Sequence, residues 1–139
     1  MNIGVLGTGL VGQTIGSRLV LLGHDVMMGS RDAGNPTAIA WSKDEGPHAL
    51  HGTFMNAASF GEIIINCTLG SASLDAIRLA GAENLKGKIL IDTANPLDYT
   101  SKFWTLTVSN TDSLGEQIQR AFPDTRVVKT LSTMNAIVM

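Results

Sequence analysis

The feature that most constrains this sequence is a set of closely spaced glycines near its start, in the segment Gly7-Thr-Gly-Leu-Val-Gly12. Residues 2–6 before it are apolar and typical of a buried strand, whereas residues 10–22 repeat apolar side chains at helical spacing. In such a strand–turn–helix, Gly7 permits the tight turn, Gly9 lets a pyrophosphate approach the backbone, and Gly12 lets the helix lie close to the strand. The helix N-terminus offers free N–H groups and a positive dipole end. The pattern predicts the first βαβ unit of a dinucleotide-binding domain.

Strand-like and helical patterns alternate along the rest of the chain. Further strands are expected at residues 24–28, 53–55, 62–68, 87–92 and 126–131. Further helices are expected at residues 36–45, 73–81 and 113–122, with a short helical turn at 57–61 and an irregular stretch at 94–111. This order predicts an α/β fold, a Rossmann-type doubly wound parallel sheet of about six strands with helices on both faces. The 139 residues contain no internal repeat, so we expect one domain over residues 1–139.

Composition and charge exclude several classes of protein. Ten Lys and Arg residues against twelve Asp and Glu residues give a net charge of −2, which argues against a nucleic-acid or membrane partner. No apolar run approaches the roughly 20 residues of a membrane-spanning helix. Met1 leads directly into a strand, so we expect no signal peptide and a cytoplasmic location. The single cysteine excludes an internal disulfide, and His48 and His51 have no third ligand nearby, so no metal site is expected.

The residues after the second strand bear on which dinucleotide is bound. A site for NAD usually has Asp or Glu there to hold the ribose hydroxyls. This chain has Gly29-Ser-Arg31 instead. Arg31 can pair with a 2′-phosphate through two parallel hydrogen bonds, and Ser30 can donate another. Asp32 follows one or two positions after the place of that carboxylate, and its side chain is expected to point to solvent. We therefore predict NADP(H) rather than NAD(H), the alternative being that Arg31 is an ordinary surface arginine.

Later loops are expected to complete the site, because ligands of open α/β sheets bind at the carboxyl ends of the strands. Thr68-Leu-Gly70 follows the fourth strand, and Asn95-Pro96 follows the fifth. Leu69 is a candidate to cover the adenine or the ribose. The alternative for each of these residues is an ordinary strand-to-helix turn.

No catalytic side chain is predicted. Tyr99 and Lys102 are three residues apart in a segment that reads as loop, whereas short-chain carbonyl reductases place these residue types four apart on a helix. Cys67 lies in the most apolar strand and is expected to be a buried thiol rather than a nucleophile. Reducing a carbonyl requires a proton donor, whereas moving a hydride between a nicotinamide and a flavin-like ring mainly requires alignment of the two rings. The absence of an evident acid favours the second chemistry.

Four segments together carry a family resemblance: Asn2-Ile-Gly-Val-Leu-Gly-Thr-Gly-Leu-Val-Gly12, Gly29-Ser-Arg31, Lys88-Ile-Leu-Ile-Asp-Thr-Ala-Asn-Pro96 and Val127-Val-Lys-Thr-Leu-Ser-Thr-Met-Asn-Ala136. Over residues 1–139 the chain resembles the coenzyme F420-dependent NADP oxidoreductase family, and also the nucleotide domains of the transmembrane ferric reductases. The first segment is shared by many Rossmann proteins. The last two are much more specific to this group.

The resemblance implies roles for particular residues. Residues matching Thr8, Ser30 and Arg31 hold the 2′-phosphate in that family. Backbone around Ala136 meets the nicotinamide carboxamide, and residues 132–136 line the place where the second ring stacks. Asn35 stands about where some members have a lysine for the phosphate, which implies a lower affinity. Family enzymes also continue into a C-terminal region that helps to form the acceptor pocket and the dimer.

The sequence therefore predicts an NADP(H)-binding oxidoreductase domain that transfers a hydride between NADPH and a small-molecule acceptor, a deazaflavin (F420) or a flavin. A non-enzymatic NADP-sensing or regulatory module and the N-terminal domain of an NADPH-dependent imine or carbonyl reductase remain as alternatives, and a homodimer is left open. The predicted cofactor-binding residues are Gly7, Thr8, Gly9, Leu10, Val11, Gly12, Ser30, Arg31, Thr68, Leu69, Gly70, Asn95, Pro96, Met134, Asn135 and Ala136.

Overall fold

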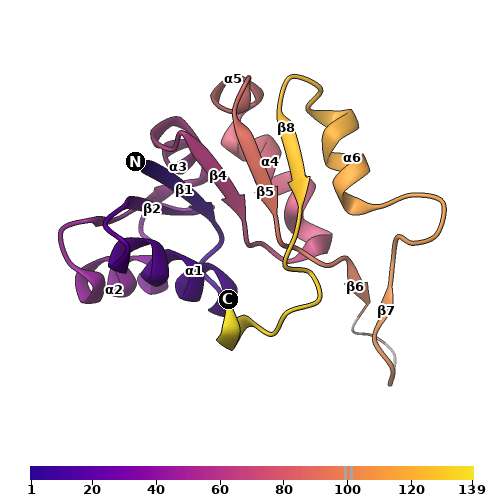
Figure 1. Ribbon diagram of the computed structural model, residues 1–139, viewed down its shortest axis with the longest axis horizontal. Coiled ribbons are helices and arrows are strands. Elements are labelled where there is room, and N and C mark those ends of the chain that lie inside the picture. Colours follow the sequence, from indigo (N-terminus) through magenta and orange to yellow (C-terminus); the bar gives the residue numbers. More distant parts are fainter. Residues whose placement is uncertain (99, 101) are drawn as a thin grey trace.

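The computed structural model describes every residue of the chain except 99 and 101, so Tyr99, which was expected in a loop and not in a catalytic pair with Lys102, lies outside the described residues. Its main element is a six-stranded parallel sheet with the strand order β3-β2-β1-β4-β5-β8 (Figure 1). The chain runs outward from β1 to β3, then crosses back and continues outward from β4 to β8. This reversal places a topological switch point between β1 and β4. The predicted doubly wound α/β fold is confirmed.

The elements follow one another in the order β1 (Asn2–Leu6), α1 (Leu10–Leu21), β2 (Asp25–Ser30), α2 (Pro36–Glu45), β3 (Ala49–Thr53), α3 (Phe54–Phe60), β4 (Ile63–Asn66), η1 (Gly70–Ala72), α4 (Ser73–Ala80), α5 (Ala82–Leu85), β5 (Ile89–Asp92), β6 (Leu97–Asp98), β7 (Thr105–Leu106), α6 (Leu114–Ala121), β8 (Arg126–Lys129) and η2 (Ala136–Val138).

Two apolar cores hold helices against the two faces of the sheet. On one face Ile15 of α1 and Trp41 of α2 pack with Ile3, Val5 and the neighbouring strands. On the other face α3, α4, α5 and α6 contribute a separate buried cluster around Ile64 and Leu90. Figure 1 shows η2, at the end of the chain, lying beside α1. The carboxyl ends of the strands remain accessible between these layers.

The third strand was predicted at the wrong place. Of the expected residues 53–55 only Thr53 belongs to a strand, because β3 runs over Ala49–Thr53 and α3 begins at Phe54. The reason is a reciprocal cap, in which the Thr53 hydroxyl accepts from the Asn56 N–H at 3.1 Å and Asn56 Oδ1 accepts from the Thr53 N–H at 2.9 Å. The helical turn expected at 57–61 is therefore the second part of a longer helix.

Three further differences concern element boundaries. Strand β2 extends through Ser30, which was expected in the loop. The irregular stretch at 94–111 contains β6 and β7, which pair antiparallel as a small separate sheet. Helix α5 was not predicted, because its four residues are too few for a periodic pattern. Within the described residues no helix is both long and apolar enough to span a membrane.

Candidate cofactor site

A large cavity, of about 1030 Å³, opens at the carboxyl ends of the strands beside the switch point. It brings together most of the predicted cofactor-binding residues: Gly7, Thr8, Gly9, Leu10, Val11, Ser30, Arg31, Thr68, Leu69, Gly70, Asn95, Met134 and Ala136. It is not lined by Gly12, Pro96 or Asn135. Gly12 and Pro96 are buried behind the wall, and Asn135 is exposed and caps η2 by accepting the Ile137 N–H at 3.0 Å. The cavity is large enough for a dinucleotide-sized ligand.

The glycine loop between β1 and α1 forms the floor of this cavity. Gly7 has a φ of 115°, and a Cβ there would lie 2.7 Å from the Cys67 carbonyl oxygen, so only glycine fits the turn. A Cβ on Gly12 would collide with the Gly7 carbonyl oxygen, which confirms that this glycine lets the helix approach the strand. A Cβ on Gly9 would meet no atom within 4 Å. Gly9 therefore opens onto the cavity.

The N-terminus of α1 is suited to an anion. Gly9 is its N-cap, no side chain caps it, and its first turn contains no acidic residue. The unpaired N–H groups and the dipole of this helix therefore point toward the cavity without competition from a local carboxylate. The turn itself is held by the Gln13 amide, which donates to the Thr8 carbonyl at 2.9 Å.

Arg31, Ser30, Asp32 and Asn35 line the β2 side of the cavity. Arg31 is exposed and forms no ion pair with any residue that the structure describes, so its guanidinium is available to a ligand. The hydroxyl of Ser30 is buried and donates to the Asp32 carbonyl, so its only proton is already used within the turn. Asp32 is exposed as expected, and one carboxylate oxygen accepts the Gly34 N–H at 2.9 Å. Asn35 caps α2 by accepting the Ala38 N–H at 3.0 Å.

One wall of the cavity was missed by sequence reasoning. Phe54 and the α4 side of the molecule contribute an apolar surface with one carboxylate, formed by Ala72, Asp75, Ala76 and Leu79. These last four positions follow the spacing i, i+3, i+4 and i+7 of one helix face. That spacing, counted from the loop at residues 68–70, is the signal that could have identified them.

Among the described residues that line the β5–β8 side of the cavity, none has a carboxylate side chain. This side is formed by Cys67, Thr93, Ala94, Asn95, Leu131, Met134, Ala136 and Met139. Burial, opposed by a hydrogen bond from Thr93 and reinforced by the Asp92 charge, raises the pKa of the Cys67 thiol to about 12. The thiol is therefore neutral and a weak acid, in keeping with the prediction that it is not a nucleophile.

His48 and His51 lie elsewhere, paired with Asp25 and Ser42 respectively, each at 2.8 Å. Among the described residues no group of three metal-ligating side chains is present.

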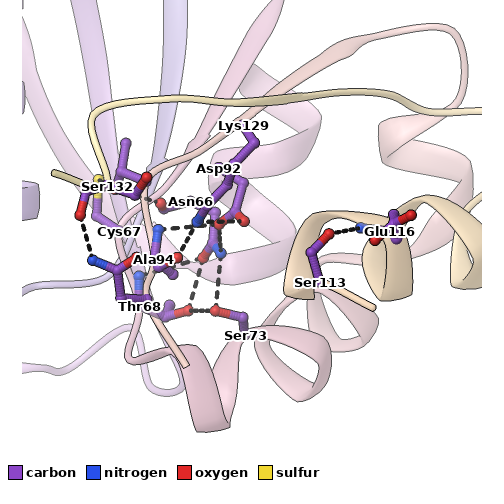
Figure 2. A network of polar contacts seen from close by, with 12 residues as sticks. Asn66, Cys67, Thr68, Ser73, Asp92, Ala94, Ser113, Glu116, Lys129 and Ser132 are labelled. Carbon is purple, nitrogen blue, oxygen red and sulfur yellow. Dashed lines mark hydrogen bonds and ion pairs between the residues drawn. The ribbon is translucent and has the colours of Figure 1, made fainter. Parts of the chain in front are cut away.

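Loops on this side are tied to one another (Figure 2). Asn95 Nδ2 donates to the Ser132 carbonyl at 2.7 Å, which links the loop after β5 to the segment after β8. A Cβ on Gly70 would collide with the Asn95 carbonyl oxygen, so the loop after β4 packs directly on the loop after β5. Leu131, where the last segment leaves β8, has a φ of 57°, a conformation that a branched side chain rarely adopts.

The strand order, the glycine turn and the cavity at the switch point define a Rossmann-type dinucleotide-binding α/β domain. The family model of NADP oxidoreductase, coenzyme F420-dependent, matches residues 2–96. The chain belongs to this family. No curated protein matches it.

Solved structures extend the comparison. A candidate F420-dependent NADP reductase from Arthrobacter sp. FB24 is 49% identical, with a TM-score of 0.91, and the match covers 99% of this chain and 65% of that one. A hypothetical protein, SMa0349, from Sinorhizobium meliloti is 16% identical with a TM-score of 0.83, covering 99% and 64%. An imine reductase from Streptomyces aurantiacus is 19% identical with a TM-score of 0.66, covering 93% and 39%. The last two share the fold alone, and this chain spans slightly less than two thirds of the first two.

Proposed function

We propose that residues 1–139 form the NADP(H)-binding domain of an oxidoreductase that transfers a hydride between NADPH and a deazaflavin, F420, or a flavin-like acceptor. The observation that carries the proposal is the pairing of two features across one cavity. Gly9 opens onto the cavity at an uncapped helix N-terminus, and the unpaired Arg31 lines the β2 side. A diphosphate fits the first feature, and a 2′-phosphate fits the second.

The chain's own residues then have distinct tasks. The glycine loop and the first turn of α1 bind the diphosphate through backbone N–H groups. Arg31 binds the 2′-phosphate together with Thr8. Ser30 serves chiefly to shape the turn, because its hydroxyl proton is donated to the Asp32 carbonyl. The α4 wall, with Leu69 and Leu79, supplies an apolar surface for the adenine. NADPH, when bound, supplies the hydride.

The β5–β8 side of the cavity fits hydride transfer between two rings. Backbone in residues 131–136 orients the nicotinamide, and the neighbouring loop at residues 93–96 shapes the pocket. The two carboxylates that line the cavity, Asp32 and Asp75, lie on the β2 side and on α4. With Cys67 neutral, no described lining residue on the nicotinamide side is suited to donate a proton, which favours an acceptor that needs only a hydride and ring alignment.

The test of cofactor choice is the substitution Arg31→Ala, titrated calorimetrically with NADPH and with NADH. Losing a charge-assisted contact of about 1.5–3 kcal/mol is expected to weaken NADPH binding roughly 10- to 100-fold. NADH binding is expected to change little. Arg18→Ala is the matched control, because Arg18 is an exposed arginine in the last turn of α1, at the opposite end of that helix. Equal losses for both cofactors would remove Arg31 from the phosphate role.

The acceptor is tested separately, by following absorbance of the dihydronicotinamide with F420, with FMN and with a cyclic imine. Oxidation of NADPH by F420 or FMN alone supports the proposed reaction. Tight binding of NADPH with no turnover of any acceptor would instead favour an NADP-sensing module. Turnover of the imine alone would favour the reductase class that shares this fold at 19% identity.

A further inference from the structure

A buried polar cluster joins the carboxyl ends of three neighbouring strands, and neither the family assignment nor the proposed function uses it. Asn66 of β4 pairs in register with Asp92 of β5, and Asp92 pairs in register with Lys129 of β8. Asn66 and Asp92 are fully buried, and the Lys129 side chain is 34% exposed. The cluster lies directly beneath the loops that line the cavity (Figure 2).

Every polar group of the central pair is satisfied. Asn66 Nδ2 donates to Asp92 Oδ1 at 2.8 Å and to the Ser73 hydroxyl at 3.0 Å. Asn66 Oδ1 accepts from the Thr68 hydroxyl at 2.7 Å. Lys129 Nζ donates to Asp92 Oδ2 at 3.1 Å. A fully connected network of this kind holds one geometry rigidly, because any displaced member leaves a buried group without a partner.

The network reaches the cavity through the loop after β5. Asp92 Oδ1 accepts the Ala94 N–H at 3.2 Å, and Lys129 Nζ donates to the Ala94 carbonyl. Residue 94, which lines the cavity, is thus held from both sides of its backbone. The next residue, Asn95, holds Ser132 at the start of the segment that lines the β5–β8 side.

Stability alone does not account for a charge at this position. Two residues earlier on the same face of the sheet, the corresponding row is Ile64, Leu90 and Val127, which is entirely apolar. Buried ion pairs are often no better for stability than apolar residues of similar volume. The polar row occurs where the sheet meets the cavity, and its bonds run to the loops of the cavity.

We infer that Lys129 and Asp92 are positioning residues for the nicotinamide half of the site, an inference that rests on the proposed function. Lys129 fixes the backbone of residue 94 against Asp92. The bond from Asn95 to the Ser132 carbonyl then fixes the segment after β8, and with it the position of the nicotinamide ring. Neither Lys129 nor Asp92 bonds to the glycine loop or to Arg31, which hold the diphosphate and the 2′-phosphate in the proposed function.

The experiment compares two ligands on full-length chains. NADPH spans both halves of the site, whereas adenosine 2′,5′-bisphosphate reaches only the adenine half. In Lys129→Met, which keeps the unbranched stem and removes the charge, NADPH binding is expected to weaken about tenfold, the value of one charge-assisted hydrogen bond at its lower limit. The affinity for the bisphosphate is expected to stay within about twofold. At saturating NADPH the enhancement of dihydronicotinamide fluorescence is expected to fall as well.

Two further variants give the rescue and the control. Lys129→Arg retains the charge and the donors and is expected to restore NADPH affinity and fluorescence. Lys88→Met is the matched control, because Lys88 is also a partly buried lysine that donates to a backbone carbonyl, that of Ala58 at 2.7 Å, but it precedes β5 and so lies at the opposite end of the strand from the cavity. Lys88→Met is expected to leave the ratio of the two affinities unchanged.

A third variant keeps the test decisive if Lys129→Met does not fold. Asn95→Ala removes only the bond to Ser132 and is expected to weaken NADPH alone, by about 2- to 10-fold. Losses that are equal for both ligands, or no loss in either variant, would overturn the positioning role. A wild-type chain that binds neither ligand would overturn the proposed function and this inference together, whereas wild-type binding with a uniform response overturns the inference alone.

Discussion

In the half of the sheet formed by β1, β2 and β3, the cavity wall is shaped by glycine backbone, whereas in the half formed by β4, β5 and β8 it rests on buried polar side chains. In the first half, Gly7 and Gly12 have no room for a Cβ, and Gly9 exposes main chain to the cavity. In the second half, Asn66, Asp92 and Lys129 hold the loops through side-chain bonds.

The contrast fits the part of the cofactor that is proposed for each half. A diphosphate is recognised by N–H groups at a helix end, so close approach of backbone matters most there. A planar ring needs a pocket whose loops keep one arrangement, and a satisfied polar network provides that rigidity. Substitutions in the first half are therefore expected to act by steric collision with the backbone. Substitutions in the second half are expected to act by loosening the loops that the polar network holds.

The strongest break in the first half is expected from Gly12→Ala. The new methyl group would collide with the backbone carbonyl of Gly7, which cannot move without opening the turn. We expect a loss of about 3 kcal/mol or more in the free energy of unfolding, the upper end for an overpacked site, together with loss of NADPH binding. Urea unfolding followed by circular dichroism measures the first effect, and calorimetry the second.

Gly115 provides the control in the other half. It is also a buried helical glycine, in α6, but a Cβ there would lie 3.7 Å from its nearest neighbour, the Lys129 Cβ, which is ordinary contact. Gly115→Ala is expected to be neutral or to stabilise the protein by up to about 1 kcal/mol through helix propensity. If Gly12→Ala were tolerated equally well, steric exclusion would not be what shapes the glycine loop.

A smaller and more selective effect is expected from Gly9→Ala. Gly9 has a φ of −76°, which alanine adopts freely, and its Cβ would meet no protein atom within 4 Å. The melting temperature without ligand should therefore stay the same. The methyl group would point toward the diphosphate and cost about 1–3 kcal/mol of binding, roughly 5- to 150-fold in Kd. Melting curves with and without NADPH test this, and an undiminished shift would place the diphosphate elsewhere.

The same contrast explains how much the sequence could predict. Helix ends and glycine turns depend on local patterns: Asn35-Pro36 is typical of a helix start and Gly23 of a helix end, and the roles of Gly7 and Gly12 follow from their spacing. Gly23 does adopt a positive φ of 86° where α1 ends. The strand β3 was misplaced because Thr53 ends the strand and also caps the helix that follows, through its bonds with Asn56.

The polar network could not be predicted, because it depends on register between distant strands. Asn66, Asp92 and Lys129 are far apart in the chain, and each looks like the polar end of an apolar strand. Only the pairing of β4, β5 and β8 brings them into one row. In the same way Phe54 joins the α4 wall of the cavity only through the fold. Local chemistry is readable from sequence, whereas contacts across strands require the sheet.

The smallest expected effect concerns Cys67, which follows β4 where the two halves meet. Burial raises the pKa of this thiol from 9.0 to about 12. Up to about pH 8 the thiol is protonated in both the folded and the unfolded chain, so it does not affect stability. Above about pH 8 it ionises in the unfolded chain first, so stability is expected to fall, by about 1.4 kcal/mol at pH 10 relative to Cys67→Ala. Urea unfolding of both proteins at pH 8 and pH 10 measures this difference.

The rate of alkylation of Cys67 in the folded protein gives a second measurement. This rate is expected to rise about tenfold per pH unit from pH 8 to pH 10 without a plateau, since the reactive thiolate remains a minor form. Identical pH dependence of the stability of the two proteins, or a plateau in the alkylation rate near pH 9, would mean that folding does not raise the pKa of this thiol.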